Sequence, residues 1–323
     1  MAIESIGTPG LWIGFTAFVL TMLAVDLGVF HRQAHKVSIK EALVWSVVWM
    51  TLALIFNAGV YHWFGATRGL EFLTGYLIEK ALAVDNIFVF AVIFSYFAVP
   101  VAYQHRVLFW GILGALVLRA IFIVLGAALL QKFHWVIYLF GAFLILTGIK
   151  LLLQGDDEIH PERNPVFRLF KRMVRSVSEY HDGRFFVSKN GKRYATPLLL
   201  VLVSVEVTDV IFALDSIPAI FAVTSDPFIV YTSNIFAILG LRSLYFLLAG
   251  VMHKFEYLKI GLALVLAFVG AKMVLTDIYK IPIGVSLGVV AALIVGSVIL
   301  SLLRPHKRAQ RDSADIHPEK RSA

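Results

Sequence analysis

Two apolar stretches of the chain contain carboxylates: "IEKALAVDNIF" at residues 78–88 and "VEVTDVIFALDSIPA" at residues 205–219. Both lie inside apolar runs that are long enough to span a bilayer. An ionised side chain at the centre of a spanning helix costs about 2.5–3.5 kcal/mol on insertion scales, so such residues usually belong to a site or a pathway. The two stretches therefore predict an all-α membrane protein with a polar site in its interior.

The composition supports a membrane protein. Of the 323 residues, 59% are hydrophobic and only 15% are charged, and the mean hydropathy is +0.82. A soluble domain has about 25% charged residues. The N-terminus has no basic segment before its first apolar run, so we expect no cleavable signal peptide. The chain has no cysteine, which excludes disulfides, thiolate metal sites and thiol redox chemistry within it.

About nine segments have the length and apolarity of a spanning helix. They are residues 11–30, 42–63, 72–99, 107–130, 133–153, 196–223, 228–251, 255–276 and 281–303. Lys150 and Lys272, near the ends of their segments, are expected to extend toward the headgroups.

The distribution of basic residues predicts the orientation. Most of them follow the first, third, fifth and seventh spans or lie in the C-terminal tail, whereas the opposite loops hold only Arg68, Lys132 and Lys280. By the positive-inside rule the N-terminus is outside and the C-terminus is cytoplasmic. This alternation also explains the net charge of +8 as membrane topology, so we expect no nucleic-acid partner.

The long loop before the sixth span contains "RFFVSKNGKRYAT" at residues 184–196. Two β-rich runs around Asn190 and Gly191 predict a type I′ hairpin, which we expect to pack on another element because isolated hairpins are marginally stable. The preceding segment, 166–177, has the pattern of a basic amphipathic helix on the headgroups, but a solvated connector fits equally well.

The two acidic stretches begin two similar halves. "ALAVDNIF" aligns with "IFALDSIP", so that Asp85 matches Asp215 and Asn86 matches Ser216. Further on, "LVLRAIF" aligns with "LGLRSLY", and "LTGIKLLL" aligns with "FVGAKMVL". Lys132 to Lys150 spans 18 residues, as does Lys254 to Lys272. Chance similarity of apolar sequences is the alternative, but charged landmarks recurring in one order favour a repeat.

A unit of three spans is odd, so the second copy enters the membrane from the opposite side. The pattern thus predicts an inverted 3+3 repeat, with a binding site near the midplane where the copies meet. The expected units are a two-helix segment (1–71), the first repeat (72–153), a loop with the hairpin (154–195), the second repeat (196–276), and a ninth helix with a basic tail (277–323).

Helical spacing groups the polar residues. Glu79 and Asn86 are seven positions apart and share a helix face, as do Asp209 and Ser216, while Glu206 lies one turn from Asp209. Asp85 and Asp215 point elsewhere on ideal helices, so a shared site needs an irregular turn or two helices around it.

Pro218 offers such an irregularity. It lacks an N–H group and frees the carbonyl of Leu214 beside Asp215, which makes a carbonyl–carboxylate pair for a hard cation. The first copy has Phe88 at the equivalent position.

The charges at membrane depth limit what the site can bind. Five carboxylates face three basic groups (Lys80, Arg119 and Arg242), a formal charge of −2. One divalent cation or two protons would neutralise it, and some acids could simply pair with the arginines. Carboxylate, amide and hydroxyl oxygens suit Mg²⁺, Ca²⁺ and Mn²⁺, whereas Zn²⁺ and Cu⁺ are poor candidates without Cys or His in the motifs.

Other chemistry finds no support in the sequence. It contains no Walker-type phosphate loop and no haem-ligating pattern, so we expect neither ATP hydrolysis, nor a prosthetic group, nor an enzymatic activity.

The segments "GYLIEKALAVDNIFV" and "VEVTDVIFALDSIPAIFAVTSDPFIVYTSNIFAILGLR" resemble the TerC family of integral membrane proteins, in particular its Alx-type bacterial members. The resemblance covers nearly the whole chain. It implies a bacterial inner-membrane protein associated with manganese efflux and with tellurite or alkaline-pH response. The family's intramembrane acids fall on Glu79, Asp85, Glu206, Asp209 and Asp215. A redox-modulator label used in the family finds no support in a chain without cysteine.

The leading hypothesis is a secondary transporter that exports Mn²⁺, with proton antiport as its drive. Asp85 and Asp215 would be the central ligands, with Asn86, Ser216, Glu79 and Asp209 completing or gating the site. Glu206 would be a ligand or proton carrier, and Arg119 and Arg242 would hold acids in place.

Two alternatives stay open. The protein could be a membrane scaffold or stress-response factor that recruits partners through its loop, or a carrier of protons or monovalent cations. The expected partners are a divalent metal ion and membrane lipid, and a homo-oligomer is left open.

Overall fold

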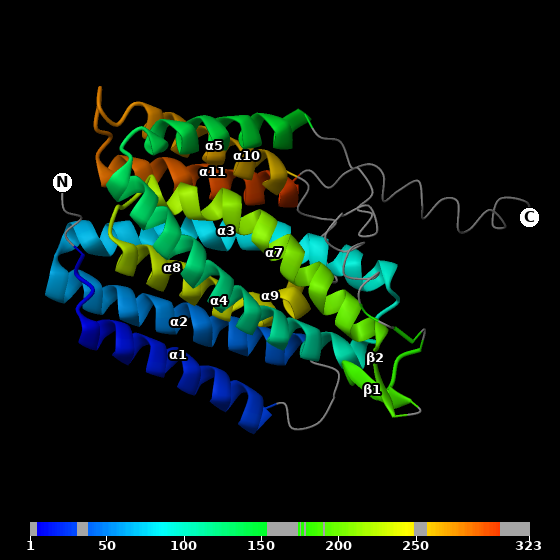
Figure 1. Cartoon of the computed structure of the whole chain (residues 1–323). Coiled ribbons are helices and arrows are strands. Elements are labelled where there is room, and N and C mark those ends of the chain that lie inside the picture. The colour runs from blue at the N-terminus through cyan, green and yellow to red at the C-terminus, as the bar shows by residue number, and fades with distance from the viewer. Residues whose placement is uncertain are drawn as a thin grey trace, which may run out of the picture.

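The computed structural model describes residues 5–30, 38–153, 174, 176–177, 179–189, 191–248 and 257–303. The side chains of residues 26–30 and of Asp85 lie outside this description. Within it the chain is a bundle of long helices with one small hairpin (Figure 1).

Five helices form the first half of the bundle. They are α1 (Pro9–Phe30), α2 (Ile39–Phe64), α3 (Ala66–Tyr96), α4 (Val101–Lys132) and α5 (Val136–Leu153). The side chain of Ser38 accepts a hydrogen bond from the Glu41 N–H and caps the start of α2. The chain reverses direction at Gly65, between α2 and α3. Gly65 has a φ of 91°, a backbone conformation that residues with a Cβ rarely adopt.

The second half contains α7 (Pro197–Phe221), α8 (Pro227–Leu239), α9 (Leu241–Leu248), α10 (Leu258–Val274) and α11 (Ile283–Leu303). Helices α7 and α8 each begin with a proline, whose missing N–H is not needed in a first turn. Helix α7 continues through Pro218 without a break. The predicted seventh span, 228–251, matches the candidate span Pro227–Leu248, which is divided into two helices because α8 ends at Leu239 and α9 begins at Leu241.

The helices confirm an integral membrane protein with several passes. Six segments are long and apolar enough to cross a bilayer within the described residues, counting Pro227–Leu248 as one. Helix α3 does not count among them because of its charged residues, and α10 is shorter, with 17 residues. Many large apolar side chains are exposed on the outer faces, as lipid contact requires.

The two ends of the bundle carry different features (Figure 1). The N-terminal end holds the start of α1, the turn at Gly65 and the connections 222–226 and 275–282. The hairpin end holds the hairpin, the α3–α4 turn and the last residue of α11, Leu303. Helices α3 and α5 run from the N-terminal end to the hairpin end, whereas α4, α7 and α10 run the opposite way.

The predicted hairpin is confirmed. Strands β1 (Phe186–Lys189) and β2 (Lys192–Ala195) pair antiparallel, with Gly191 at φ of 72° in the turn. Phe185 packs under the guanidinium of Arg106, 5.4 Å from the ring centroid, and Tyr180 donates a hydrogen bond to the carbonyl of Phe97. The hairpin is therefore docked on the α3–α4 turn. The predicted amphipathic helix at 166–177 falls almost entirely outside the described residues.

Candidate ion site between the acidic helices

Arg119 of α4 lies at the centre of the bundle, with 1% of its surface exposed. Its guanidinium donates hydrogen bonds to Glu79 of α3, to Asp209 of α7 at 3.1 and 3.4 Å, and to Ser216 of α7 at 3.2 Å. A buried charge persists only when it is paired and hydrogen-bonded, and the planar fork of arginine suits two carboxylates. The formal charge of the Arg119, Glu79 and Asp209 side chains together is −1.

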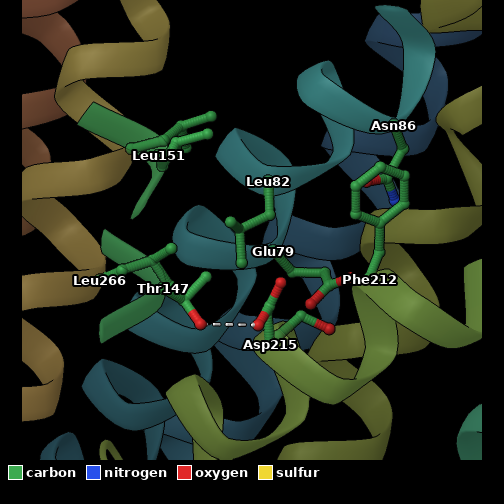
Figure 2. A pocket seen from close by; sticks show the side chains of 10 residues that line it. Glu79, Leu82, Asn86, Thr147, Leu151, Phe212, Asp215 and Leu266 are labelled. Atoms are coloured by element: carbon green, nitrogen blue, oxygen red, sulfur yellow. Dashed lines mark hydrogen bonds between the residues drawn. The ribbon is translucent and has the colours of Figure 1, made fainter. Parts of the chain in front are cut away.

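A cavity of about 50 Å³ adjoins this cluster (Figure 2). A single water needs about 10–15 Å³ measured in this way, so the cavity has room for an ion with a few water molecules. Helices α3, α5, α7 and α10 contribute the lining residues, which are Glu79, Leu82, Asn86, Thr147, Leu151, Phe212, Asp215, Ser216, Leu262 and Leu266.

Apart from the Asn86 amide nitrogen, the polar side-chain atoms that line the cavity are oxygens, which can act as metal ligands. Asp215 accepts a hydrogen bond from Thr147 of α5 at 3.2 Å, drawn as the dashed line in Figure 2. Glu79 Oε2 and Asn86 Oδ1 are buried and have no hydrogen-bond partner among the described residues. Burying a polar atom without a partner costs about 1–3 kcal/mol, which indicates that a ligand or water normally meets these two oxygens.

The sequence predicted seven ligands, and the structure brings four of them to the cavity: Glu79, Asn86, Asp215 and Ser216. Asp209 is held by Arg119 and does not line the cavity. Glu206 packs its carboxylate against Gly114 of α4. The side chain of Asp85 lies outside the described residues. Within those residues, no three His, Asp or Glu side chains are grouped as a metal site would require.

The three predicted charge partners lie in different places. Arg119 joins Glu79 and Asp209 as expected. Lys80 donates to the carbonyl of Ala237 at 3.0 Å, near the break between α8 and α9. Arg242 lines a second, small cavity with Glu41 of α2.

Thr147 is the site residue that sequence reasoning missed. It is the hydroxyl residue of the "LTGIKLLL" segment, which was used only to align the repeat. A polar residue in an apolar helix was the available signal, but its partner Asp215 is 68 residues away along the chain.

The fold and the site together define a multi-pass membrane protein that has a buried ionic cluster beside an oxygen-lined cavity. The chain belongs to the integral membrane protein TerC family, whose model matches residues 64–309.

Relatives are similar over almost their full length. A membrane protein of Myxococcus xanthus, described as uncharacterized, is 59% identical over 309 residues, which cover 96% of this chain and 97% of the relative. A protein of Escherichia coli K12 with the provisional name of membrane-bound redox modulator Alx is 53% identical, covering 92% and 96%. A Rickettsia bellii membrane protein is 40% identical, covering 91% and 97%. No solved structure matches the chain.

Proposed function

We propose that this TerC-family protein is a secondary transporter that exports a hard divalent cation, with Mn²⁺ as the first candidate. The observation that carries the proposal is a pair of buried oxygens, Glu79 Oε2 and Asn86 Oδ1, which have no hydrogen-bond partner among the described residues and lie at one cavity with Asp215. Carboxylate, amide and hydroxyl oxygens are the ligands that Mg²⁺, Ca²⁺ and Mn²⁺ prefer. Manganese is placed first because of the family resemblance.

In this proposal Asp215 and Asp85 are the central ligands. Glu79, Asn86 and Ser216 complete the shell from the cavity wall. Asp209 forms an ion pair with Arg119. The guanidinium therefore competes with the ion for the carboxylates and lowers the affinity of the site for the ion during release. Glu206, beside Asp209 on α7, is an additional ligand or a proton carrier.

We further propose the inverted repeat, and two close contacts between α5 and α10 support it. A Cβ on Gly270 would lie 2.6 Å from the carbonyl oxygen of Gly141, and one on Gly148 would lie 2.6 Å from that of Ala263. In the sequence alignment Gly148 matches Gly270, and Gly141 matches Ala263. The two contacts therefore exchange under a two-fold axis between the helices. Helix packing is reciprocal too, since α4 packs on α7 as α8 packs on α3.

The first experiment measures the metal content of cells by mass spectrometry, with and without expression. Wild type should lower cellular manganese, and Asp215→Asn should lose most of this effect because the ligand loses its charge. Asp277→Asn, which changes an exposed aspartate at the N-terminal end, is the matched control and should behave as wild type. Full export by both Asp215→Asn and Asp85→Asn would sink the site assignment.

Proton antiport is tested in liposomes that contain the purified protein. Manganese uptake should be faster when a pH gradient drives protons the other way across the membrane. Equal rates with and without the gradient would exclude coupling. Flux of protons or sodium without any divalent ion would instead favour the carrier of protons or monovalent cations.

A membrane scaffold or stress-response factor is the second candidate, favoured by the docked hairpin. Lys189, Lys192 and Arg193 are exposed on it and offer a basic surface to a partner. Changing these three residues to Gln leaves the packed Phe185 in place, which deleting 185–195 would not. A lost cellular phenotype with intact manganese flux would favour the scaffold.

We also propose that the protein lies in a bacterial inner membrane, with the hairpin end in the cytoplasm and the N-terminus outside. The alternation of basic residues between loops supports this orientation.

A further inference from the structure

From Glu79 the cavity extends toward the hairpin end along α3, α5 and α10. On α3, Leu82 and Asn86 lie on the hairpin side of Glu79. Leu151 is two residues before the end of α5 at the hairpin end, and Leu262 is in the second turn of α10 from that end. On α7, which runs the opposite way, the lining residues Phe212, Asp215 and Ser216 lie between the depths of Asp209 and Ser216, both of which Arg119 contacts.

Apolar side chains close the other side of the cluster. Ile123 and Ala127 of α4, one and two turns beyond Arg119, are buried with Phe221, Val223 and Met273 in one core cluster. Phe221 packs against Gly126, where a Cβ would lie 3.0 Å from its ring. These residues, Ile123, Ala127, Phe221, Val223 and Met273, form the apolar plug.

Beyond the plug, a hydrogen-bonded network ties the N-terminal end together. Glu71 Oε2 of α3 accepts from the hydroxyl of Thr224 at 2.8 Å and from Arg68 Nη1 at 2.9 Å. The Thr224 hydroxyl oxygen accepts from the N–H of Asp226 at 3.2 Å, and Asp226 accepts from Ser5 at 2.7 Å. Glu71, Thr224 and Asp226 are called the latch.

The latch joins parts that must separate if this end is to open. Glu71 belongs to α3, whereas Thr224 lies in the connection between α7 and α8, in the other half of the chain. Thr224 is buried and its hydroxyl donates a hydrogen bond to a carboxylate, and hydrogen bonds to charged groups are the stronger class. Glu71 and Glu79 are eight positions apart on α3, which is about 12 Å along the helix axis. Ile123 and Ala127 lie about 6 and 12 Å beyond Arg119 along α4, so the plug occupies the space between the cluster and the latch.

We propose that the latch and the apolar plug are the closed outer gate of the transporter, and that the Thr224–Glu71 bond holds it shut. The structure is then the state in which the N-terminal end is closed and the cavity lies on the hairpin side of the gate. This inference rests on the proposed transport function and assigns residues to its outward opening.

The absence of natural cysteines allows the test to use single reporter cysteines in sealed vesicles with a membrane-impermeant thiol reagent. Ala127→Cys reports on the plug. Ser188→Cys, at an exposed position of the hairpin, reports on the hairpin face. Ile278→Cys reports on the N-terminal face, because Ile278 is 83% exposed.

Thr224→Val removes the hydroxyl and should raise the labelling rate of Ala127→Cys from the N-terminal face by about tenfold, the population change expected for one bond to a charged group. Thr224→Ser keeps the hydroxyl and should restore the original rate. Thr232→Val is the matched control, because within the part of the chain that the structure describes the buried Thr232 bonds to carbonyls of its own helix α8 and to no other element.

Unchanged labelling in Thr224→Val, or an increase equal to that in Thr232→Val, would overturn the gate. Constant labelling of the two face reporters shows that the variants keep the wild-type topology, and an unchanged thermal-unfolding midpoint shows that they are folded; for a variant that fails either check, Glu71→Gln replaces Thr224→Val and must raise the rate. Labelling that responds to the latch without manganese flux would reject the proposed cargo and keep the gate. Normal flux with unresponsive labelling would reject the gate alone.

Discussion

At the scale of single residues, Arg119 places one positive charge between acids that come from two helices. Glu79 and Asp209 are 1% and 3% exposed, so neither can replace the guanidinium with bulk water. Removing one partner of a buried ion pair leaves an uncompensated charge, which is more costly than the net contribution of the intact pair.

We expect Arg119→Met to lower the free energy of unfolding by about 3–5 kcal/mol, because two carboxylates lose their partner. Thermal unfolding in detergent measures the effect. Lys132→Met, on the exposed end of the same helix, should change stability by less than about 0.5 kcal/mol.

The triple variant Arg119→Met/Glu79→Gln/Asp209→Asn removes the stranded charges together with the guanidinium. It should recover part of the lost stability. An Arg119→Met protein as stable as Lys132→Met would contradict a structural role for the cluster.

The sequence predicted which residues are buried at this scale, and less well which of them meet. The burial of Glu79, Asp209, Asn86 and Ser216 follows from apolar neighbours at helical spacing. The partnership of Thr147 with Asp215 depends on how α5 packs on α7, which local sequence does not encode. Lys272 was wrongly predicted to extend to the headgroups: it is 8% exposed and donates to Ser286 of α11 at 3.3 Å.

At the scale of elements, α5 and α10 approach closely because glycines face backbone carbonyls. Gly148→Ala and Gly270→Ala should each destabilise the protein by about 1–3 kcal/mol, since the added Cβ would lie 2.6 Å from a carbonyl oxygen. Gly288→Ala in α11, with nothing within 4 Å of the new Cβ, should be neutral or stabilising by up to about 1 kcal/mol. Thermal unfolding of the three variants decides; equal effects would refute the close approach.

A second element-scale prediction concerns the exposed link between the α4–α5 turn and the α10–α11 connection. Hydrogen bonds from Tyr138 and His134 to Asp277 lower the pKa of this carboxyl below its ordinary value of 3.8. A depressed folded-state pKa stabilises the fold above the unfolded value, and the contribution is lost as the pH falls through the folded value. Wild type should therefore lose its stability advantage over Asp277→Asn below about pH 4. An unfolding midpoint difference independent of pH between 3 and 6 would contradict this.

Helix positions were largely predictable because apolar runs of about 20 residues have few other conformations in a membrane. The break between α8 and α9 was not predicted, since one glycine in an apolar run is a weak signal. Tertiary packing explains it: the Lys80 ammonium lies 2.7 Å from where a Cβ on Gly240 would be and bonds to the carbonyl of Ala237. The lysine thus stabilises the C-terminal carbonyls of α8.

At the scale of the whole molecule, the bundle presents two distinct ends, and the loop charges predict which one is cytoplasmic. Ser188→Cys should be labelled by an impermeant reagent only from the cytoplasmic face, and Ile278→Cys only from the outer face. Right-side-out and inverted vesicles distinguish the two. Labelling of both positions from the same face would contradict the topology.

The sequence by itself determined the membrane class, the helical segments, the hairpin and the burial of acids, because each follows from local hydropathy and spacing. Only the tertiary structure decided that Arg119 binds Glu79 and Asp209 together and that α5 supplies Thr147 to Asp215. It also decided that a cavity lies beside Glu79, with Leu82 and Asn86 lining it on the hairpin side. These features depend on helix pairs that are distant in sequence, whose rotation and depth are set by packing contacts such as the glycine–carbonyl approaches of α5 and α10.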